Sequence, residues 1–337
     1  MKKDPLKNDL DRRTFLQIAS IGTLGLALSP TIFSQTKTSG FPKAVSSFPL
    51  TAVRLKPSPF LDAVNANLKY LHKLEPDRLL HNFRVHAGLK PKSDAYGGWE
   101  ADTIAGHSLG HYLTACALIY AQTGNEECKK RTEYIVNELA ECQTAARDGY
   151  VSGFTRKKGD VTEDGKVIFA EMEKGDIRSA GFNLNGSWVP FYTWHKLFSG
   201  LFAAHEYCGN EKALEVAKGL GNFIDAFFSK INDEQLQKIL NCEHGGINES
   251  FAELYARTND KRFLDLSIRI RHQKTLGPMF AQEDKLQGIH ANTQIPKVIG
   301  LARIYELTKQ PEYATAAQFF WKNVTTKYSY VIGGNSD

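Results

Sequence analysis

Apolar positions recur at helical spacing along most of the chain, in pairs of segments joined by short polar turns. The first segment of a pair is small and apolar, as at Leu197, Leu201 and Ala204, whereas the second carries more charge, as at Glu211 and Lys212. Apolar residues three or four positions apart predict amphipathic helices, and short connections predict that the two helices pack antiparallel. The pattern therefore predicts helical hairpins in which the first helix lines the interior and the second faces water.

Four of these hairpins end their first helix in the same way, with a tyrosine followed by a polar turn. The segments read IYAQTGN, EYCGN, LYARTND and IYELTKQP, and the last three tyrosines, Tyr207, Tyr255 and Tyr305, are 48 and 50 residues apart. A period of about 50 residues is the length of one helical hairpin. Stacked hairpins with inner and outer helices predict an all-α solenoid or a closed α/α toroid.

The segment between the first two hairpins breaks this repeat and lengthens the interval from Tyr120 to Tyr207 to 87 residues. Residues 147–186 are rich in Gly, Asp and Lys, which predicts a long loop that can include a hairpin. Loops of this length inside a compact domain are usually functional, as lids or as walls of a subsite. The predicted helices are 59–80 (with a second turn opened by Pro76), 103–122 with 126–143, 191–207 with 211–230, 247–257 with 261–274, and 293–307 with 311–327.

Polar residues capable of chemistry open each of the four inner helices. Because the inner helices run in the same direction, we expect their starts, and these polar clusters, to converge at one end of the toroid. Imidazoles, amides, carboxylates and indole rings together suit a sugar, since hydroxyl groups need both donors and acceptors and ligand pockets combine aromatic walls with a few placed polar groups. The clusters are Gly106–His111, Trp188–Lys196, Glu243–Glu249 and His290–Lys297.

The histidines of the first two clusters have both a functional and a structural interpretation. His107 and His111 are four residues apart, which is also the spacing of metal ligands on a helix, but no glutamate stands between them and no third ligand follows. A pocket or helix-capping role is therefore favoured over zinc. His195, next to Trp194, is either a sugar ligand or a buried core histidine, and we favour the ligand.

The other two clusters add carboxylates and amides. His244 precedes Gly245 and Gly246, which let a backbone approach closely and favour a binding role. Glu243 and Glu249 are weak candidates for an acid/base pair, although either can simply favour a helix N-terminus. Lys297 can have either a binding role or a structural role. The predicted substrate-binding residues are Trp99, His107, His111, His195, His244, His290 and Gln294.

Composition and charge exclude several classes of protein. The 337-residue chain is 42% hydrophobic and 23% charged, with a net charge of +5, as in ordinary globular proteins. No dense block of Lys and Arg follows the N-terminus, so we expect no nucleic-acid partner. The five cysteines are an odd number without tight spacing, and only Cys242 adjoins a polar cluster. This usage predicts neither a disulfide framework nor a zinc ribbon, and we expect no metal or cofactor in this chain.

The N-terminus has the pattern of an export signal rather than of a folded element. Arg12–Arg13 precedes an uncharged run, Ile18–Leu28, which is shorter than the roughly 20 residues of an ordinary membrane span. Paired arginines, a short apolar run and small residues predict a twin-arginine signal peptide over residues 1–35. Residues 36–57 are expected to be a linker and 58–337 the helical domain. The mature protein is therefore expected in the periplasm or outside the cell, with no membrane partner after cleavage.

Five long segments resemble the bacterial β-L-arabinofuranosidases of glycoside hydrolase family 127 and its near relatives. The resemblance implies an (α/α)6 toroid, of which this chain holds about four inner helices, and an exo-acting, retaining glycosidase. The implied partner is a plant-type oligosaccharide or polysaccharide that contains L-arabinose. The resemblance also implies that histidines at inner-helix starts contact the sugar, which concerns His195 and His244 first, then His107, His111 and His290. The segments are YGGWEADTIAGHSLGHYL (96–113), LNGSWVPFYTWHKLFSGL (184–201), EHGGINESFAELYA (243–256), LQGIHANTQIPKVIGLARIYELT (286–308) and YVIGGNSD (330–337).

The catalytic groups of the family do not match any residue of this chain. The resemblance places the general acid/base, a glutamate, a few residues after the turn Gly333–Asp337, and the nucleophile, a cysteine held on zinc, further on. Both positions fall beyond Asp337. We therefore expect the N-terminal portion of the enzyme, without the family's catalytic residues, and zinc only in the full-length enzyme. The alternative is a non-catalytic carbohydrate-binding protein with the same helical toroid; a purely structural scaffold leaves the His and Trp at the inner-helix starts unexplained.

Overall fold

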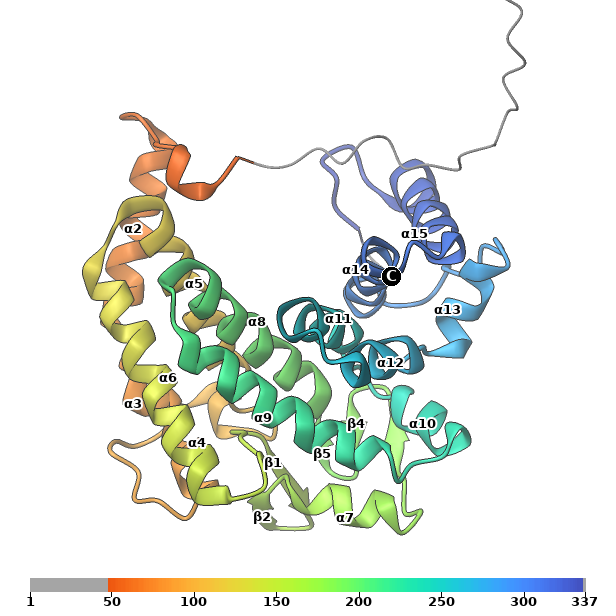
Figure 1. The fold of residues 1–337 in the computed structure, drawn as a ribbon, viewed down its shortest axis with the longest axis horizontal. Coiled ribbons are helices and arrows are strands. Elements are labelled where there is room, and N and C mark those ends of the chain that lie inside the picture. The colour runs from red at the N-terminus through yellow and green to blue at the C-terminus, as the bar shows by residue number, and fades with distance from the viewer. Residues whose placement is uncertain (1–47, 336–337) are drawn as a thin grey trace, which may run out of the picture. The chain divides into compact units, whose positions relative to one another are not determined.

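Helices make up most of the computed structural model, which describes residues 48–335 (Figure 1). The contacts divide the chain into two units, Met1–Ala44 and Val45–Asp337. The first unit, and with it the export signal predicted for residues 1–35, lies outside the described residues. In the described part of the second unit the strands are few and short, which confirms the predicted all-α class.

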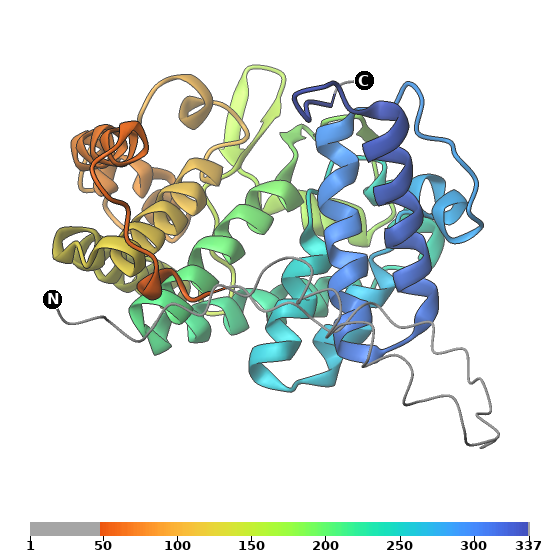
Figure 2. The same ribbon diagram turned by 90° about the horizontal axis from the view of Figure 1, so that it is seen from above.

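The four predicted hairpins are present, each formed by an inner helix and the outer helix that follows it. α5 packs on α6, α8 on α9, α11 on α12 and α14 on α15, and Figure 2 shows the last pair side by side. α5 begins at His107 rather than at Thr103 because Gly106 precedes it in a left-handed conformation, with φ of 99°. The bounds are His107–Thr123 for α5, Glu126–Ala146 for α6, Pro190–Cys208 for α8, Glu211–Phe228 for α9, Ile247–Thr258 for α11, Lys261–Arg269 for α12, Ala291–Thr308 for α14 and Pro311–Asn323 for α15.

The inner helices α5 and α8 run parallel, with their backbones in contact. Gly110 of α5 lies so close to α8 that a Cβ there would meet the carbonyl carbon of Lys196 at 2.3 Å. Further along both helices, Leu113 lies against Gly200. Contacts that advance together along two helices mean that the helices point the same way, so the starts of α5 and α8 lie on the same side.

The helices α8, α11 and α14 continue this parallel arrangement. Residues in contact again advance together along neighbouring helices, so the four inner helices all begin at the same end of the hairpin stack. The closure of six such hairpins into a full toroid stays a prediction. The contacts are His195–Gly246 and Glu206–Arg257 between α8 and α11, and Asn248–Lys297 and Glu253–Arg303 between α11 and α14.

The hydrophobic core lies between the inner and outer helices. Leu109 of α5, Phe198 and Leu201 of α8, Leu220 of α9 and Phe251 of α11 are buried in one continuous cluster. Burying such a side chain stabilises the fold by about 1.5–3 kcal/mol. The apolar stripes that predicted the hairpins therefore also fix how the hairpins stack.

Further helical elements lie outside the four hairpins. α2 ends at Lys73 because Pro76 restricts the conformation of Glu75 and cannot continue the hydrogen-bond ladder, and Pro76 opens the next helix as expected. No helix in the described residues is both long and apolar enough to span a bilayer. The elements are α2 (Pro59–Lys73), α3 (Pro76–Leu79), α4 (His81–His86), α10 (Asp233–Leu240), α13 (Gln273–Phe280), the 3₁₀ helices η1 (Leu50–Ala52) and η2 (Gly98–Ala101), and the π-helix η3 (Val324–Tyr328).

The segment predicted as a long loop is largely ordered into short strands and a helix. β1 pairs antiparallel with β2, which places Thr155 opposite Asp164. After α7, the strands β3, β4 and β5 form an antiparallel sheet that leads into α8. The hairpin that the sequence allowed in this segment is β1–β2, whereas an alternating pattern cannot be recognised over the two-residue strands β3, β4 and β5, which were not predicted. The bounds are β1 (Thr155–Lys158), β2 (Val161–Asp164), α7 (Val167–Glu173), β3 (Ser179–Ala180), β4 (Asn183–Leu184) and β5 (Ser187–Trp188).

Candidate functional site

A cluster of aromatic and imidazole rings lies at the start of α5. The indole of Trp99 leans on His107, with ring centroids 5.6 Å apart, and the edge of Trp188 meets Trp99 at 6.0 Å. His107 also contacts His111 and Tyr192, each with centroids 6.1 Å apart. The structure thus brings together three of the predicted residues, Trp99, His107 and His111. We call these three, with Trp188 and Tyr192, the aromatic cluster.

Glu100 supports His107 from behind and was not singled out in the sequence. It is 8% exposed; its Oε2 accepts the N–H of Gly106 at 2.9 Å, and its Oε1 lies 3.6 Å from His107 Nδ1. That nitrogen donates to the carbonyl of Ile104 at 3.0 Å. In the neutral form of an imidazole whose Nδ1 donates, Nε2 is the acceptor. The available signal was its place beside Trp99, which does not distinguish a buried carboxylate from a surface one.

His195 is fixed by the start of α11. Its Nδ1 accepts the backbone N–H of Gly246 at 3.0 Å, and its Nε2 lies 3.7 Å from Oε2 of Glu249. Because Nδ1 is the acceptor, Nε2 carries the proton and directs it towards Glu249. Burial lowers the pKa of His195, while the interaction with Glu249 acts to raise it. The imidazole is therefore neutral near pH 7, with a defined tautomer.

Gly245 and Gly246 are required because the imidazole of His195 lies directly against them. A Cβ at Gly245 would meet Nδ1 of His195 at 2.7 Å, and the φ of 56° at Gly245 is one that other residues rarely adopt. A Cβ at Gly246 would meet Nε2 of His195 at 3.0 Å and Oε2 of Glu249 at 3.1 Å. The group that approaches this turn closely is thus the ring of His195.

Lys196 places an ammonium group near two carboxylates. Its Nζ lies over the ring of Tyr192, 5.0 Å from the centroid. Burial lowers the pKa of Lys196, and the negative charges of Glu249 and Glu243 act to raise it. The two carboxylates on either side of the Gly245–Gly246 turn therefore interact with the same cation.

Glu243 connects this region to a cavity. Its backbone N–H donates to the carbonyl of Gly181 at 2.8 Å, and its buried Oε2 accepts the hydroxyl of Thr293 at 3.0 Å. The cavity has a volume of about 430 Å³, within the range of about 300–1,000 Å³ that is usual for small-molecule sites. We call it the Glu243 pocket; it is lined by Ser179, Ala180, Gly181, Phe182, Asn241, Cys242, Glu243, His272, Lys274, Thr275, Ile289, His290, Thr293, Gln294 and Lys297.

Lys297 brings a buried positive charge to this pocket. The residue is 2% exposed, and its Nζ donates to Oε1 of Gln294 at 3.0 Å and to Nδ1 of His272 at 3.3 Å. Burial lowers the pKa of Lys297 to about 8, although the charge of Glu243 acts to raise it. Burial and the charge of Lys297 also lower the pKa of His272 to about 4. His272 was missed in the sequence because it belongs to no motif there.

His244 lies behind the Glu243 pocket rather than in its lining. The residue is buried; its Nδ1 donates to the carbonyl of Cys242 at 3.0 Å, and its ring meets His272 edge-on at 5.8 Å. Burial holds the pKa of His244 well below its ordinary value, and the charge of Lys297 adds to the effect. Of the predicted residues, Glu243, His290 and Gln294 line the pocket, and His244 packs beneath it.

Trp194, which belongs to the polar cluster Trp188–Lys196 of the sequence, is part of the hydrophobic core. Its ring stacks on Phe169 with centroids 5.1 Å apart, and its indole N–H donates to the carbonyl of Val151 at 3.1 Å. A buried indole needs such a partner for its N–H. One step along an α-helix turns the side chain by about 100°, which is why Trp194 and His195 face different surroundings.

The described residues do not form a metal site. Within residues 48–335 no group of three or more His, Cys, Asp or Glu side chains is arranged to hold a metal ion. Burial raises the pKa of Cys242 to about 12, which keeps this thiol protonated and neither a nucleophile nor a metal ligand. The described residues therefore do not fit the zinc ion that the family resemblance implies.

Residues 52–337 match the family described as β-L-arabinofuranosidase, GH127 catalytic domain. The chain belongs to glycoside hydrolase family 127. A curated relative, the non-reducing end β-L-arabinofuranosidase of Bifidobacterium longum subsp. longum, is 26% identical over 253 residues, which are 66% of this chain and 35% of that protein. The chain therefore spans about a third of the length of the curated relative that it matches.

Two solved GH127 structures have a similar fold. The β-L-arabinofuranosidase from Geobacillus stearothermophilus T6 is 16% identical, with a TM-score of 0.52, over 85% of this chain and 44% of the other. A second GH127 β-arabinofuranosidase is 17% identical, with a TM-score of 0.56 and the same coverage of 85% and 44%. At these identities the likeness concerns the fold alone, and it agrees with the all-α GH127 architecture.

Proposed function

We propose that this chain forms the sugar-binding side of a glycosidase that removes L-arabinofuranosyl residues from plant-type glycans. The observation that carries the proposal is the gathering of imidazoles, carboxylates and indoles where the parallel inner helices begin. Membership of GH127 supports the reaction class. The proposal includes export by the twin-arginine signal of residues 1–35, a linker over 36–57, and a site of action in the periplasm or outside the cell.

His195 and Glu249 are proposed to hold one hydroxyl group of the sugar between them. Their nitrogen and oxygen lie 3.7 Å apart, which is too long for a direct hydrogen bond. A sugar hydroxyl placed between them can accept the Nε2 proton of His195 and donate its own proton to the carboxylate. Lys196 balances the charge of that carboxylate, so the site does not need a cation from the substrate.

The aromatic cluster and Glu243 supply the other contacts in this proposal. The exposed face of Trp99 suits the apolar face of a sugar ring, and Nε2 of His107 is available as a hydrogen-bond acceptor. Glu243 accepts from Thr293 at 3.0 Å and retains lone pairs for a second donor. The described residues therefore bind and orient a sugar through both polar and stacking contacts.

Bond cleavage is assigned to other groups in this proposal. Glu243 and Glu249 stay weak candidates for an acid/base pair within the described residues. Among the described residues, the arrangement around His195 resembles a site that holds a hydroxyl rather than one that breaks a bond. The chain's own part is thus to recognise the arabinofuranosyl ring.

Binding of simple glycosides to the full chain tests the proposal. Isothermal titration or saturation-transfer NMR should detect methyl β-L-arabinofuranoside more strongly than its α anomer. His195→Gln and Glu249→Gln should each weaken the binding roughly tenfold or more, since each removes a hydrogen bond to a charged or strongly polar group. Unchanged thermal unfolding temperatures would show that the variants remain folded.

His205→Gln is the matched control because it lies on the same helix. Its Nε2 is 3.5 Å from Oε2 of Glu211, a geometry like that of His195 and Glu249, but near the far end of α8. We expect no change in sugar affinity for this variant. Absence of binding to either anomer by the unaltered chain would contradict the proposal. Sugar binding without hydrolysis by a longer chain that contains the family's Glu and Cys motifs would favour the non-catalytic alternative.

A further inference from the structure

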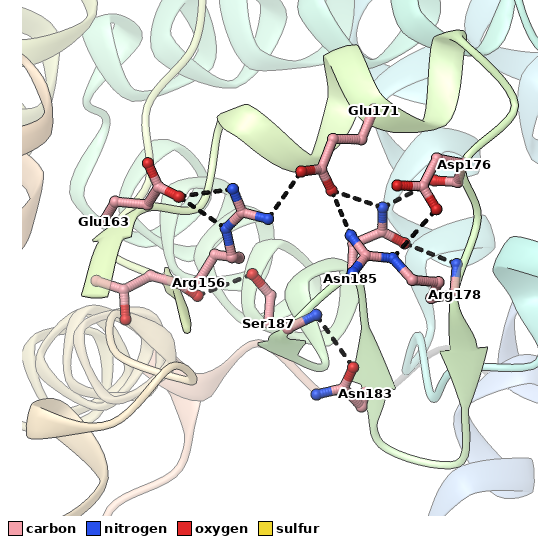
Figure 3. Close-up of polar contacts among 10 residues, drawn as sticks. Arg156, Glu163, Glu171, Asp176, Arg178, Asn183, Asn185 and Ser187 are labelled. Atoms are coloured by element: carbon pink, nitrogen blue, oxygen red, sulfur yellow. Dashed lines mark hydrogen bonds and ion pairs between the residues drawn. The ribbon is translucent and has the colours of Figure 1, made fainter. Parts of the chain in front are cut away.

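The segment between α7 and α8 forms an arm whose base is held by a polar network; we call residues 176–188 the arm. Asn185 has a left-handed backbone, with φ of 51°. Its N–H donates to the carbonyl of Arg178 at 2.9 Å, and its Oδ1 accepts the N–H of Arg178 at 2.8 Å. Its Nδ2 donates to Oε2 of Glu171 at 2.9 Å and to the carbonyl of Asp176 at 2.8 Å (Figure 3). One amide side chain therefore closes the base of the arm.

Arg156 ties this base to the β1–β2 hairpin. The side chain is buried, and it donates to Oε1 of Glu171 at 2.8 Å and twice to Oε1 of Glu163, at 2.9 and 2.6 Å (Figure 3). Burial acts to raise the pKa of Glu171, but hydrogen bonds from Asn185 and Arg156 outweigh it, and the pKa is lowered. Arg156 is buried and its two glutamate partners are partly exposed, so the network holds the base of the arm in place through several hydrogen bonds from one buried guanidinium.

The tip of the arm is held against the Glu243 pocket. Ala180 pairs with Asn183, so Gly181 and Phe182 form the two-residue turn between β3 and β4. The carbonyl of Gly181 accepts the N–H of Glu243 at 2.8 Å, and the carbonyl of Phe182 accepts an N–H from the start of α8 at 2.9 Å. With both its base and its tip fixed, the arm is a wall of the pocket rather than a lid.

Phe182 is half-exposed on this fixed turn. The residue is 49% exposed, lines the pocket, and meets the ring of His290 edge-on at 6.2 Å. A phenylalanine left half in water contributes little burial to the fold. An aromatic face held over a polar cavity is, however, well suited to stack on the apolar face of a sugar ring.

We propose that Phe182 is the stacking wall of a second sugar subsite, for the ring on the other side of the glycosidic bond from the ring held by His195 and Glu249. The lining of the Glu243 pocket contains no member of the aromatic cluster, so a first ring in that cluster leaves the pocket available to the next ring. Glu243 links the two, since it lies two residues before Gly245, which packs on His195, and its Oε2 accepts the hydroxyl of Thr293 in the pocket lining. The identity of the first ring rests on the proposed function.

Affinities of mono- and disaccharides for the full chain test this subsite. The probes are methyl β-L-arabinofuranoside and the methyl glycosides of β-L-arabinofuranobiose with 1→2, 1→3 and 1→5 linkages. Phe182→Ala should weaken binding of at least one disaccharide about three- to tenfold and leave the monosaccharide unchanged. Phe182→Trp should retain the disaccharide affinity. Phe60→Ala is the matched control, because Phe60 is 74% exposed on α2, and it should change neither affinity.

A second pair of variants tests whether the arm positions Phe182. Arg156 and Arg178 both pair with Glu171, but Arg156 is buried and Arg178 is half-exposed. Arg156→Met should lower disaccharide affinity as Phe182→Ala does, with the monosaccharide unaffected, whereas Arg178→Met should change neither. A loss confined to the monosaccharide, or the same for both sugars, would show that the arm has no subsite role.

The outcomes also separate this inference from the proposed function. Equal affinity of unaltered and Phe182→Ala protein for all three disaccharides overturns the subsite while leaving the first ring in place. Binding of β-1,4-galactobiose instead of the arabinobiosides, weakened by Phe182→Ala, overturns the arabinose assignment but supports the subsite. Failure of the unaltered chain to bind any of these sugars overturns both.

Discussion

The contact between His195 and the Gly245–Gly246 turn links packing to binding at the scale of single residues. Gly245→Ala introduces a Cβ that would lie 2.7 Å from Nδ1 of His195, at a φ of 56°. The backbone strain and the overpacking together should lower the free energy of unfolding by about 2–4 kcal/mol. Urea unfolding measures this change, and sugar affinity should fall with it because the imidazole must move.

Gly209→Ala separates the backbone strain from the overpacking against His195. Gly209 has a similar φ of 64°, but a Cβ there would have nothing within 4 Å. Its cost should be the backbone strain alone, about 1–2 kcal/mol, with no effect on sugar affinity. Equal destabilisation by the two alanine variants would contradict the collision with His195.

The lowered pKa of Lys297 predicts that the stability of the chain depends on pH. Its pKa falls from 10.5 to about 8 in the folded chain, so between these pH values the unfolded chain holds a proton that the folded chain has lost. Stability contributed by this residue therefore rises with pH, by up to about 3 kcal/mol between pH 8 and 10.5. Below pH 8 the buried ammonium group carries its full cost. The free energy of unfolding of Lys297→Met, compared with the unaltered chain across this range, measures the effect.

Other groups that titrate above pH 8 are common to both proteins and cancel in that comparison. Lys218→Met is a suitable control, since Lys218 lies on the surface and pairs with Glu215 on its own helix. The rise of stability with pH should be larger in the comparison for Lys297, which is 2% exposed, than in the comparison for Lys218. An equal pH dependence for Lys297→Met and Lys218→Met would mean that Lys297 keeps an ordinary pKa when folded.

Individual site residues could be predicted from the sequence only where they belong to one continuous motif. Trp99, His107 and His111 lie in one contiguous segment, and they also meet in space. Glu100 and His272 were missed because their roles depend on partners that only the fold supplies. The partner of Glu100 is the N–H of Gly106, and the partner of His272 is the ammonium group of Lys297. Nothing in the sequence distinguishes a buried polar side chain from an exposed one until its partners are known.

At the scale of elements, the four hairpins share one turn design. Each inner helix ends at a residue with positive φ, and the next residue caps the outer helix. Asn125, Asn210 and Asp260 accept a backbone hydrogen bond as side-chain caps of α6, α9 and α12. Gln310, before α15, has extended backbone angles but no side-chain cap hydrogen bond. The fourth turn therefore lacks a contact that the other three make.

Gln310→Asn should supply the missing cap and stabilise the chain by about 0.5–1 kcal/mol. The reverse change, Asn210→Gln, removes the bond from Ala213 N–H to Asn210 Oδ1 at 3.2 Å and should cost about 1 kcal/mol. Chemical denaturation of both variants measures the pair. If Gln310→Asn is neutral while Asn210→Gln is costly, the backbone before α15 is not suitably placed for capping.

Elements could be predicted where the repeat is long. Helices of 12 to 21 residues, such as α11 and α6, show several turns of apolar spacing, and their hairpins were predicted correctly. The strands β3, β4 and β5 have two residues each, and tertiary contacts rather than local pattern define them. Most of the predicted loop is ordered for that reason, since the network around Arg156 brings together residues of β1, β2, α7 and the arm.

At the scale of the whole molecule, the parallel inner helices explain why the polar residues gather. Each hairpin returns the chain to the end from which it started, so every inner helix begins on the same side. This consequence follows from short turns alone and was predictable from the sequence. The number of hairpins in a closed ring could not be predicted in this way. The described residues contain four inner helices, and the match covers only 44% of each of the two solved relatives.

At the same scale, purified residues 1–337 should bind an arabinofuranoside but should not hydrolyse an aryl β-L-arabinofuranoside. A retaining glycosidase needs an acid/base and a nucleophile on opposite sides of the anomeric carbon, about 5 Å apart in the usual carboxylate case. Here Glu243 and Glu249 both interact with Lys196, and Cys242 stays protonated. Losing such a group typically removes several orders of magnitude in rate, so release of the phenol should not exceed the background. Measurable hydrolysis that Glu243→Gln abolishes would instead place the catalytic acid inside this chain.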